Sequence, residues 1–268
     1  MIDWNVRRQE LEAELGEPIT VDGLSAGYKI FQRRHGHRHS TDDLMTAWYA
    51  LEHAPGVTRA PEVGTDDERG RPLSRALDLG AGIGGVTLLV ESAGISMVAI
   101  EAQAISYRFL VENIRGNAAR VEPIHGDLRE LALAERFALV TGSPPYFDPS
   151  AGIVPADSQK AHARFELRGD VGDYARAAVR HLAPGGQFVL CFPYQQLERA
   201  IDALHREGFT IAHRRDVIPR VGLAPLFSVF ACRLETGPEI VEPTFAVREP
   251  DGTHTAELLA VRRRFGWP

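Results

Sequence analysis

The feature that most constrains the fold of this 268-residue chain is a repeated alternation of short apolar segments with helix-forming segments between residues 75 and 191. Short apolar runs predict strands, and longer stretches with apolar residues every three or four positions predict helices. Strand, helix and strand in repeated order require parallel strands, because each helix carries the chain back across one face of the sheet. We therefore expect an α/β fold with helices on both faces of the sheet.

The expected elements of this region are short and evenly spaced. Strands are expected over 76–79, 95–100, 120–125, 137–141 and 187–192, and helices over 85–92, 103–116, 171–182 and 195–207. Two further strand-like runs, 209–218 and 225–234, are separated by only Pro219 to Gly222. So short a connection permits an antiparallel hairpin but no parallel crossover. The sheet should therefore hold seven strands and end in one reversed strand.

The remainder of the chain divides into three parts by composition. Residues 26–34 alternate apolar and polar side chains and predict a strand, and Thr41 to Asp43 offers helix-capping chemistry for an apolar helix over 44–51. We take residues 1–53 as an N-terminal extension, 54–72 as a flexible acidic loop rich in proline and glycine, and 73–268 as the main domain. All three should form one structural unit.

The charge and the cysteine content exclude several classes of protein. With 30 Lys plus Arg against 36 Asp plus Glu, the net charge of −6 argues against unselective coating of nucleic acid, although a local basic site stays compatible with it. Cys191 and Cys232 are far apart and predict neither a zinc cluster nor a disulfide framework. The first residues lack the pattern of a signal peptide, and no apolar run approaches the roughly 18 residues of a membrane helix. We expect a cytoplasmic protein that does not enter the membrane.

A glycine-rich turn follows the first strand of the core. Gly80, Ala81 and Gly82 stand where the strand passes into a helix, so the backbone can turn sharply and approach a ligand. Glu101, about 20 residues further on, is placed to accept hydrogen bonds from a ribose diol. Together with Gly85 these glycines also satisfy the dinucleotide fingerprint. The turn alone therefore leaves NAD, S-adenosylmethionine (SAM) and a purely structural packing turn open.

Acidic residues at neighbouring strand ends favour a nucleoside ligand. Asp78 directly precedes the turn, and Asp127 follows the third expected strand. Because the carboxyl ends of parallel strands meet at one edge, these carboxylates should surround one site. Asp127 also suits the N-cap of a helix over 128–133, a role compatible with ligand contact.

The segment Ser143-Pro144-Pro145-Tyr146-Phe147 follows the fourth expected strand. Two prolines cannot continue a central strand, so the chain leaves the sheet in a stiff, extended shape. The Ser143 hydroxyl and the Pro144 carbonyl then offer two acceptors for an exocyclic amine, and Tyr146 or Phe147 offers a ring for stacking. Methyl transfer to such an amine depends mainly on positioning. The alternative is a proline-rich loop whose aromatic residues cap the core.

These motifs resemble those of a known family. Residues 78–84 resemble the SAM-binding motif of class I methyltransferases, and residues 143–147 resemble the Asn/Asp/Ser-Pro-Pro-aromatic motif of amino methyltransferases. The segments 28–48, 162–166, 182–186, 219–222 and 251–258 are similar to the bacterial tRNA(Val) adenine N6-methyltransferase family. The resemblance implies a Rossmann-like class I fold, SAM as cofactor, a lid formed by the extension with Thr41 at the cofactor, and tRNA adenine as substrate.

Two departures from the family pattern leave several substrates open. Ser143 stands where that family usually carries Asn, and Ala138 where it usually carries Asp. Serine keeps an acceptor oxygen, but Ser-Pro-Pro-Tyr is also common in cytosine N4-methyltransferases. A protein glutamine amide and a small molecule are alternative substrates, and a non-catalytic SAM-binding module is a third hypothesis. Pro145 and Phe147 are expected to contact the substrate in each enzymatic case.

The densest basic cluster spans residues 33–39. Arg33 and Arg38 would suit phosphate contacts near a target base, and an ordinary solvated strand edge is the alternative. His35, His37 and His39 alternate along the same run without a clear acidic or cysteine partner. We therefore assign no metal ligands.

Overall fold

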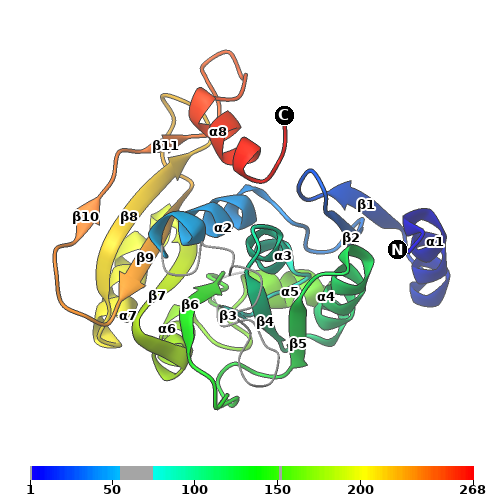
Figure 1. The fold of residues 1–268 in the computed structure, drawn as a ribbon, viewed down its shortest axis with the longest axis horizontal. Coiled ribbons are helices and arrows are strands. Elements are labelled where there is room, and N and C mark those ends of the chain that lie inside the picture. The colour runs from blue at the N-terminus through cyan, green and yellow to red at the C-terminus, as the bar shows by residue number, and fades with distance from the viewer. Residues whose placement is uncertain (1, 55–74, 151–152) are drawn as a thin grey trace.

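The computed structural model describes residues 2–54, 75–150 and 153–268, so the expected loop over 54–72 lies, apart from Ala54, outside the described residues. Its centre is a sheet with the strand order β10-β8-β9-β7-β6-β3-β4-β5 (Figure 1). The strands of the core are β3 (Arg75–Leu79), β4 (Ser96–Glu101), β5 (Val121–His125), β6 (Phe137–Gly142), β7 (Leu182–Pro193), β8 (Thr210–Ile218) and β9 (Phe227–Arg233). Six of these seven run parallel, and β9 alone is antiparallel to its neighbours. The Rossmann-like α/β prediction is confirmed.

Helices cover both faces of the sheet because the strand side chains alternate between two apolar clusters. Ala76 points into a cluster with α2 (Thr41–His53), α3 (Gly85–Ser92) and α4 (Ala104–Asn117). Leu77 and Leu79 point into the other cluster, with α6 (Val171–His181) and α7 (Leu197–Arg206). This period of two is the pleat of a strand buried on both faces.

The reversed strand does not lie at the position in the sheet that the sequence predicts. β9 is inserted between β7 and β8, so the last strand at this edge is not the reversed one. Two short strands, β10 (Ile240–Val241) and β11 (Phe245–Ala246), also pair with β8 and raise the sheet to nine strands among the described residues. A two-residue strand carries no detectable period, which is why the sequence did not predict either one.

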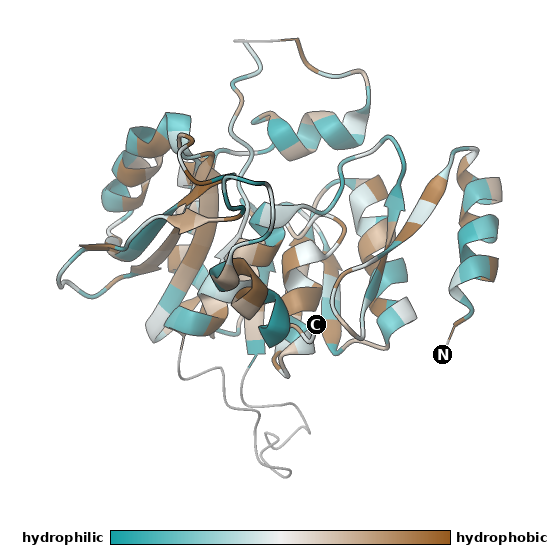
Figure 2. Ribbon diagram, turned by 90° about the horizontal axis from the view of Figure 1, so that it is seen from above, coloured by the Kyte–Doolittle hydropathy of each residue, from teal (hydrophilic) through white to brown (hydrophobic). Residues whose placement is uncertain are grey.

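The N-terminal region is richer in structure than predicted. An unpredicted helix, α1 (Trp4–Leu15), precedes a separate antiparallel hairpin of β1 (Ile19–Gly23) and β2 (Lys29–Arg33). The strand expected over 26–34 is thus the second arm of this hairpin. In α1 only Leu11 is buried, and Figure 2 shows a mostly hydrophilic helix at the N-terminus. A helix this polar lacks the apolar stripe on which the prediction relied.

The helix expected over 44–51 begins earlier, at Thr41. Its N-cap is Ser40, whose backbone amide donates to the Asp43 carboxylate at 3.0 Å in a capping box. The structure also contains α5 (Ser158–Arg164), the 3₁₀ turn η1 (Tyr194–Gln196) and α8 (Ala256–Arg264). No helix in the described ranges is both long and apolar enough to span a membrane.

Two asparagines of α4 hold the hairpin against the main sheet. The Asn113 side chain accepts from the Phe31 amide at 2.6 Å and donates to the carbonyls of Phe31 and Ile83 at 3.2 and 2.9 Å. One turn later, Asn117 accepts from the Lys29 amide at 2.9 Å and donates to the Lys29 carbonyl at 2.7 Å. Asn113 and Asn117, four residues apart on α4, thus bond to Phe31 and Lys29, which are two residues apart on β2. Asn113 is fully buried, so its bonds to Phe31 and Ile83 are shielded from water.

Replacing Asn113 by alanine should lower the free energy of unfolding by about 3 kcal/mol, because three buried backbone groups lose their partner. Asn117→Ala is the matched control, and it should cost only about 0.5 to 1 kcal/mol because water can replace its exposed bonds. Urea denaturation followed by circular dichroism measures both. Equal losses in the two variants would contradict this account of the hairpin's attachment.

Candidate active site

The carboxyl ends of β3, β4, β5 and β6 open into one cleft with an empty volume of about 970 Å³, part of it open to solvent. Eight residues predicted from the sequence as site residues line it: Asp78, Gly80, Ala81, Gly82, Glu101, Asp127, Ser143 and Pro145. They come from four successive strand ends. In a parallel sheet the carboxyl ends of the strands lie along one edge, so the residues that directly follow the strands come together there.

The turn after β3 requires glycine at two positions. Gly80 and Gly82 have φ values of +64° and +58°, in the left-handed region that side chains with a Cβ disfavour. A Cβ on Gly80 would lie 2.0 Å from the Tyr174 hydroxyl oxygen, so Tyr174 of α6 packs directly on the turn. A Cβ on Gly82 would meet no atom within 4 Å. The backbone at Gly82 therefore faces open space in the cleft.

Glu101 closes the turn from the neighbouring strand. Its carboxylate accepts from the Gly82 amide at 2.8 Å and from the Gln103 amide at 2.7 Å. Burial raises the pKa of Glu101 to about 7, against the opposing effect of these two hydrogen bonds. Each carboxylate oxygen keeps a lone pair for a further donor, as a ribose diol would supply.

Asp78 supports the turn from below. The buried carboxylate accepts from the Thr87 hydroxyl at 2.5 Å and from the Thr141 hydroxyl at 2.8 Å, which links β3 to α3 and to β6. Burial raises the pKa of Asp78 to about 6 despite these bonds. The neighbouring threonines satisfy this carboxylate within the protein, which suits a residue that shapes the turn.

Asp127 lies in a turn after β5 instead of capping a helix over 128–133, so the helix interpretation was wrong. Its carboxylate accepts from the Arg129 backbone amide at 2.9 Å and forms an ion pair with the Arg129 guanidinium at 2.6 Å. These bonds lower the pKa of Asp127 and keep it ionised. Arg168, which the sequence analysis did not single out, also lines the cleft and donates to the Ala102 carbonyl.

The Ser143 hydroxyl lies at the end of β6, where its oxygen accepts a weak hydrogen bond from the buried Cys191 thiol, with Sγ and Oγ 3.6 Å apart. The segment that follows is held by backbone bonds: the amides of Tyr146 and Phe147 both donate to the Arg164 carbonyl of α5, at 3.0 and 2.8 Å. The Gln196 side chain donates to the Tyr146 carbonyl at 2.8 Å. The segment is therefore fixed on both sides, as the two prolines predict.

The aromatic residues of this segment stand outside the cleft. Tyr146 packs edge-on against Phe192 of the core, with ring centroids 6.4 Å apart, and its ring lies 4.5 Å from that of Phe147. Phe147 is 43% exposed. Neither ring lines the cleft, and neither does Pro144, which is buried between Ser143 and Pro145. Their predicted roles at the substrate stay predictions.

Thr41 was predicted to contact the cofactor, but the structure places it in a second hollow with Pro219 and Arg248. Asp43 lines the glycine cleft in its place, and a Cβ on Gly85 would lie 2.7 Å from its Oδ2 atom. Two residues along a helix are rotated by roughly 200°, so residues 41 and 43 face opposite ways. The extension thus reaches the cleft, through a different side chain.

Arg33 and Arg38, predicted to contact phosphates, are paired inside the protein. Arg33 forms ion pairs with Glu17 at 2.6 Å and with Asp157, the N-cap of α5, at 2.7 Å. Arg38 is bound to Asp22 of β1 at 3.0 Å. Neither arginine lines the cleft. Both tie the hairpin to its surroundings, so the predicted basic site is not formed by these two side chains.

Three polar residues at the cleft were missed because they belong to α4 and α5. Gln159 donates to the Ser106 hydroxyl at 3.3 Å and accepts from the His37 amide at 3.1 Å. A Cβ on Gly36 would lie 2.1 Å from the Gln159 side-chain oxygen. The glycine within the basic cluster is therefore the one feature of the sequence that indicates this close packing. His162, named only as part of a family segment, also lines the cleft.

Curated relatives of the chain are N-methyltransferases. The chain is 27% identical over 200 residues to a tRNA1(Val) (adenine(37)-N6)-methyltransferase of Tolumonas auensis, an alignment that covers 73% of this chain and 83% of the relative. It is 30% identical over 198 residues to a release factor glutamine methyltransferase of Bordetella pertussis, covering 65% and 70% respectively. No protein-family model matches the chain.

Solved structures share the fold. A predicted O-methyltransferase, Atu636, from Agrobacterium tumefaciens superposes with a TM-score of 0.59 at 19% identity, over 84% of this chain and 97% of the other. The 16S rRNA N2 G1207 methyltransferase RsmC of T. thermophilus gives 0.54 at 19% identity, over 81% and 50%. At 19% identity, these two solved structures support the fold alone. The curated relatives support N-methylation as the chemistry. The chain therefore belongs to the SAM-dependent N-methyltransferases of the class I fold.

Proposed function

We propose that the chain transfers a methyl group from SAM to the exocyclic N6 amine of an adenine in tRNA. The observation that carries this proposal is the convergence of Gly82, Glu101 and Ser143 on one cleft. Relatives named as tRNA1(Val) (adenine(37)-N6)-methyltransferases, each aligned over more than 70% of this chain, support the choice of base and of RNA.

The residues of the cleft fit the nucleoside part of SAM. The Glu101 carboxylate accepts hydrogen bonds from the ribose hydroxyls, and the missing side chain at Gly82 leaves room for close approach of the backbone. Asp127, kept ionised by Arg129, is a further acceptor for the nucleoside. Asp78 lines the cleft and holds the turn through Thr87 and Thr141. When bound, SAM supplies an electrophilic methyl group on a positively charged sulfur.

The Ser-Pro-Pro-Tyr segment orients the amine. Ser143 accepts one amine hydrogen through its hydroxyl oxygen, and the Pro144 carbonyl accepts the other, so the nitrogen lone pair turns toward the methyl donor. Positioning of this kind supplies much of the acceleration in a reaction whose electrophile is already charged. The base stacks against Tyr146 or Phe147, whose adjoining rings form an aromatic patch beside the cleft.

A protein glutamine amide is the second candidate substrate. It is favoured by one observation, the 30% identity to a release factor glutamine methyltransferase, which exceeds the 24 to 27% identity to the tRNA enzymes. An amide nitrogen also carries two hydrogens for the two acceptors. The same site therefore accommodates both chemistries, and only the substrate distinguishes them.

Incubation of the chain with SAM and unmodified tRNA, followed by digestion and mass spectrometry of the nucleosides, should yield N6-methyladenosine. The same assay with release-factor protein, read by peptide mass spectrometry, tests the second candidate. Methylation of the release factor with none on tRNA would overturn the proposal, as would N4-methylcytidine as the only methylated nucleoside.

The variant Ser143→Ala should lose about 100-fold in methylation rate, because one acceptor of the amine disappears, while its affinity for SAM stays within about twofold of the parent's. Ser150→Ala is the matched control, since Ser150 is exposed and bonds only to Asp148 among the described residues. Single-turnover rates and calorimetric titration with S-adenosylhomocysteine separate the two effects. A Ser143→Ala enzyme as fast as the Ser150→Ala control would remove Ser143 from the mechanism.

Binding of S-adenosylhomocysteine should depend on pH through Glu101. The carboxylate accepts hydrogen bonds from the ribose hydroxyls most strongly when it is ionised, and its pKa of about 7 means that affinity rises as the pH rises through neutrality. The expected loss from pH 8 to pH 6 is about tenfold. Glu101→Gln should bind more weakly at pH 8 and lose most of this slope. A steep slope that persists in Glu101→Gln would assign the titration to another group.

A further inference from the structure

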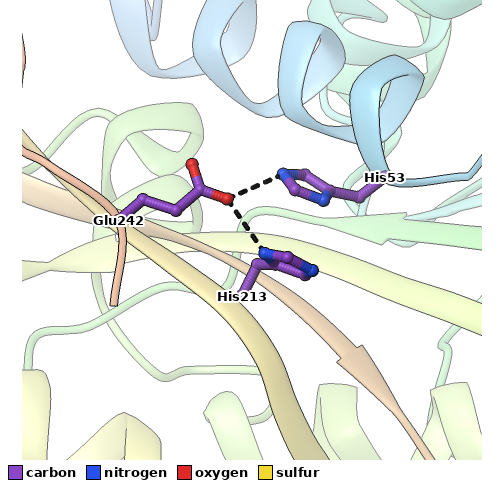
Figure 3. Close-up of side chains that lie close together, drawn as sticks. All are labelled: His53, His213 and Glu242. Carbon is purple, nitrogen blue, oxygen red and sulfur yellow. Dashed lines mark hydrogen bonds and ion pairs between the residues drawn. The ribbon is translucent and has the colours of Figure 1, made fainter. Parts of the chain in front are cut away.

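Away from the cleft, three metal-binding side chains converge between α2 and the edge of the sheet. They are His53, His213 and Glu242, and their ligand atoms all lie within 4.8 Å of one another (Figure 3). His53 ends α2, His213 lies in β8, and Glu242 follows β10. Neither the proposed methyl transfer nor the relatives' names give this group a role.

Two of the three distances between ligand atoms in the group are close to those around a small metal ion. One oxygen of Glu242 lies 3.3 Å from Nε2 of His53 and 3.0 Å from Nδ1 of His213. Ligands of a tetrahedral zinc ion are about 3.3 Å apart, given zinc–ligand bonds of roughly 2.0 to 2.1 Å. Small side-chain adjustments would therefore complete three corners of a tetrahedron, with the fourth left for water.

Backbone hydrogen bonds hold two of the three residues in place. Ile240 and Val241 pair with His213 and Arg214 of β8, and the Glu242 amide donates to the Arg214 carbonyl at 2.8 Å. This register pairs Ile240 with His213, so Glu242 lies two residues further along, where its side chain reaches back to His213 at 3.0 Å. Two of the three ligands are thus held by strand pairing and the third by a helix, which limits the entropy lost when an ion binds.

A buried tyrosine hydroxyl adjoins the group. The Tyr49 side chain is fully buried, and its hydroxyl lies close to Glu242 but outside good hydrogen-bond geometry with any described residue. Its ring is 4.2 Å from the His53 ring, one helical turn away. Buried hydroxyls are normally satisfied, and a water on a bound metal or a reoriented Glu242 oxygen would satisfy this one.

The charges around the group tolerate a divalent ion. The nearby Arg215 guanidinium forms an ion pair with Glu257 at 2.6 Å, so its charge is balanced locally. The side chains of His53, His213 and Glu242 are 16, 31 and 21% exposed, which leaves a path from solvent. We propose that His53, His213 and Glu242 bind one zinc ion that fastens the end of α2 to β8.

The choice of zinc follows from the donor set. Two imidazole nitrogens and one carboxylate oxygen suit a borderline divalent ion, whereas calcium and magnesium prefer oxygen alone. The three ligands are 160 and 29 residues apart in the sequence and form no spacing motif, so no sequence pattern marks this group. Since α2 also carries Asp43 at the cleft, the ion would steady one wall of the active site from a distance.

The test uses the full chain without a histidine tag, freed of metal by a chelator and dialysed against Zn²⁺. Elemental analysis should find one zinc per chain, and zinc should raise the melting temperature. His213→Ala and Glu242→Gln should each weaken zinc binding by at least about 100-fold and lose the shift, and Tyr49→Phe should weaken it about tenfold.

The matched control is His205→Ala, which removes a histidine that pairs with Glu239 at 2.8 Å but has no third ligand in the described ranges. It should keep the full zinc content. The proposal is overturned if the parent chain retains no more zinc than His213→Ala, or if His205→Ala loses as much. Glu242→Gln keeps the side-chain shape, so it decides the question should His213→Ala fail to fold.

Discussion

The hydrogen bond from the Gly82 amide to the Glu101 carboxylate joins the turn after β3 to the end of β4, and the geometry of the cleft depends on it. It requires a left-handed backbone at Gly82, a buried carboxylate opposite, and two parallel strands in register. Burial makes this carboxylate hard to ionise, and the two backbone amides partly offset that cost. A buried carboxylate with few donors lowers the stability of the fold, and two neighbouring hydroxyls of a ligand would supply the donors that it lacks.

The cleft is closed by parts of the chain that are distant in sequence. Asp43 of α2 lies against Gly85 at the start of α3, and Gln159 of α5 lies against Gly36 after the hairpin. In both pairs a glycine makes room for a polar side chain from another element. Residues of the predicted N-terminal extension and of the predicted main domain therefore meet at one cleft. The Arg33 ion pair with Asp157 holds the same two parts together.

Much of the fold was predictable because the core strands and helices carry strong periodic signals. The expected helix over 85–92 matches α3 residue for residue, and the strands from 76–79 to 225–234 were placed within a few residues. What escaped prediction was polar or short: α1 has one buried side chain, and β10 and β11 span two residues each. Tertiary contacts, not local pattern, stabilise such elements.

The residues of the candidate site also divide into those that the sequence predicts and those that it does not. Residues that follow strands, such as Asp78, Glu101 and Ser143, were predictable because a parallel sheet brings strand ends together. Thr41, Arg33 and Arg38 were misplaced because helix rotation and partner choice decide where a side chain points, and neither is visible in a single sequence. Arg168 and Tyr174 carried no motif at all. The His53, His213 and Glu242 group is the extreme case, since three separate elements supply one ligand each.

The central claim is that one cleft binds SAM through Glu101 and presents its methyl group to an amine held by Ser143. A crystal structure of the chain with S-adenosylhomocysteine tests this most directly. We expect the ribose hydroxyls on the Glu101 carboxylate and the sulfur facing the Ser143 hydroxyl across open space. A ligand bound in the second hollow beside Thr41, or one whose ribose does not contact Glu101, would contradict the account.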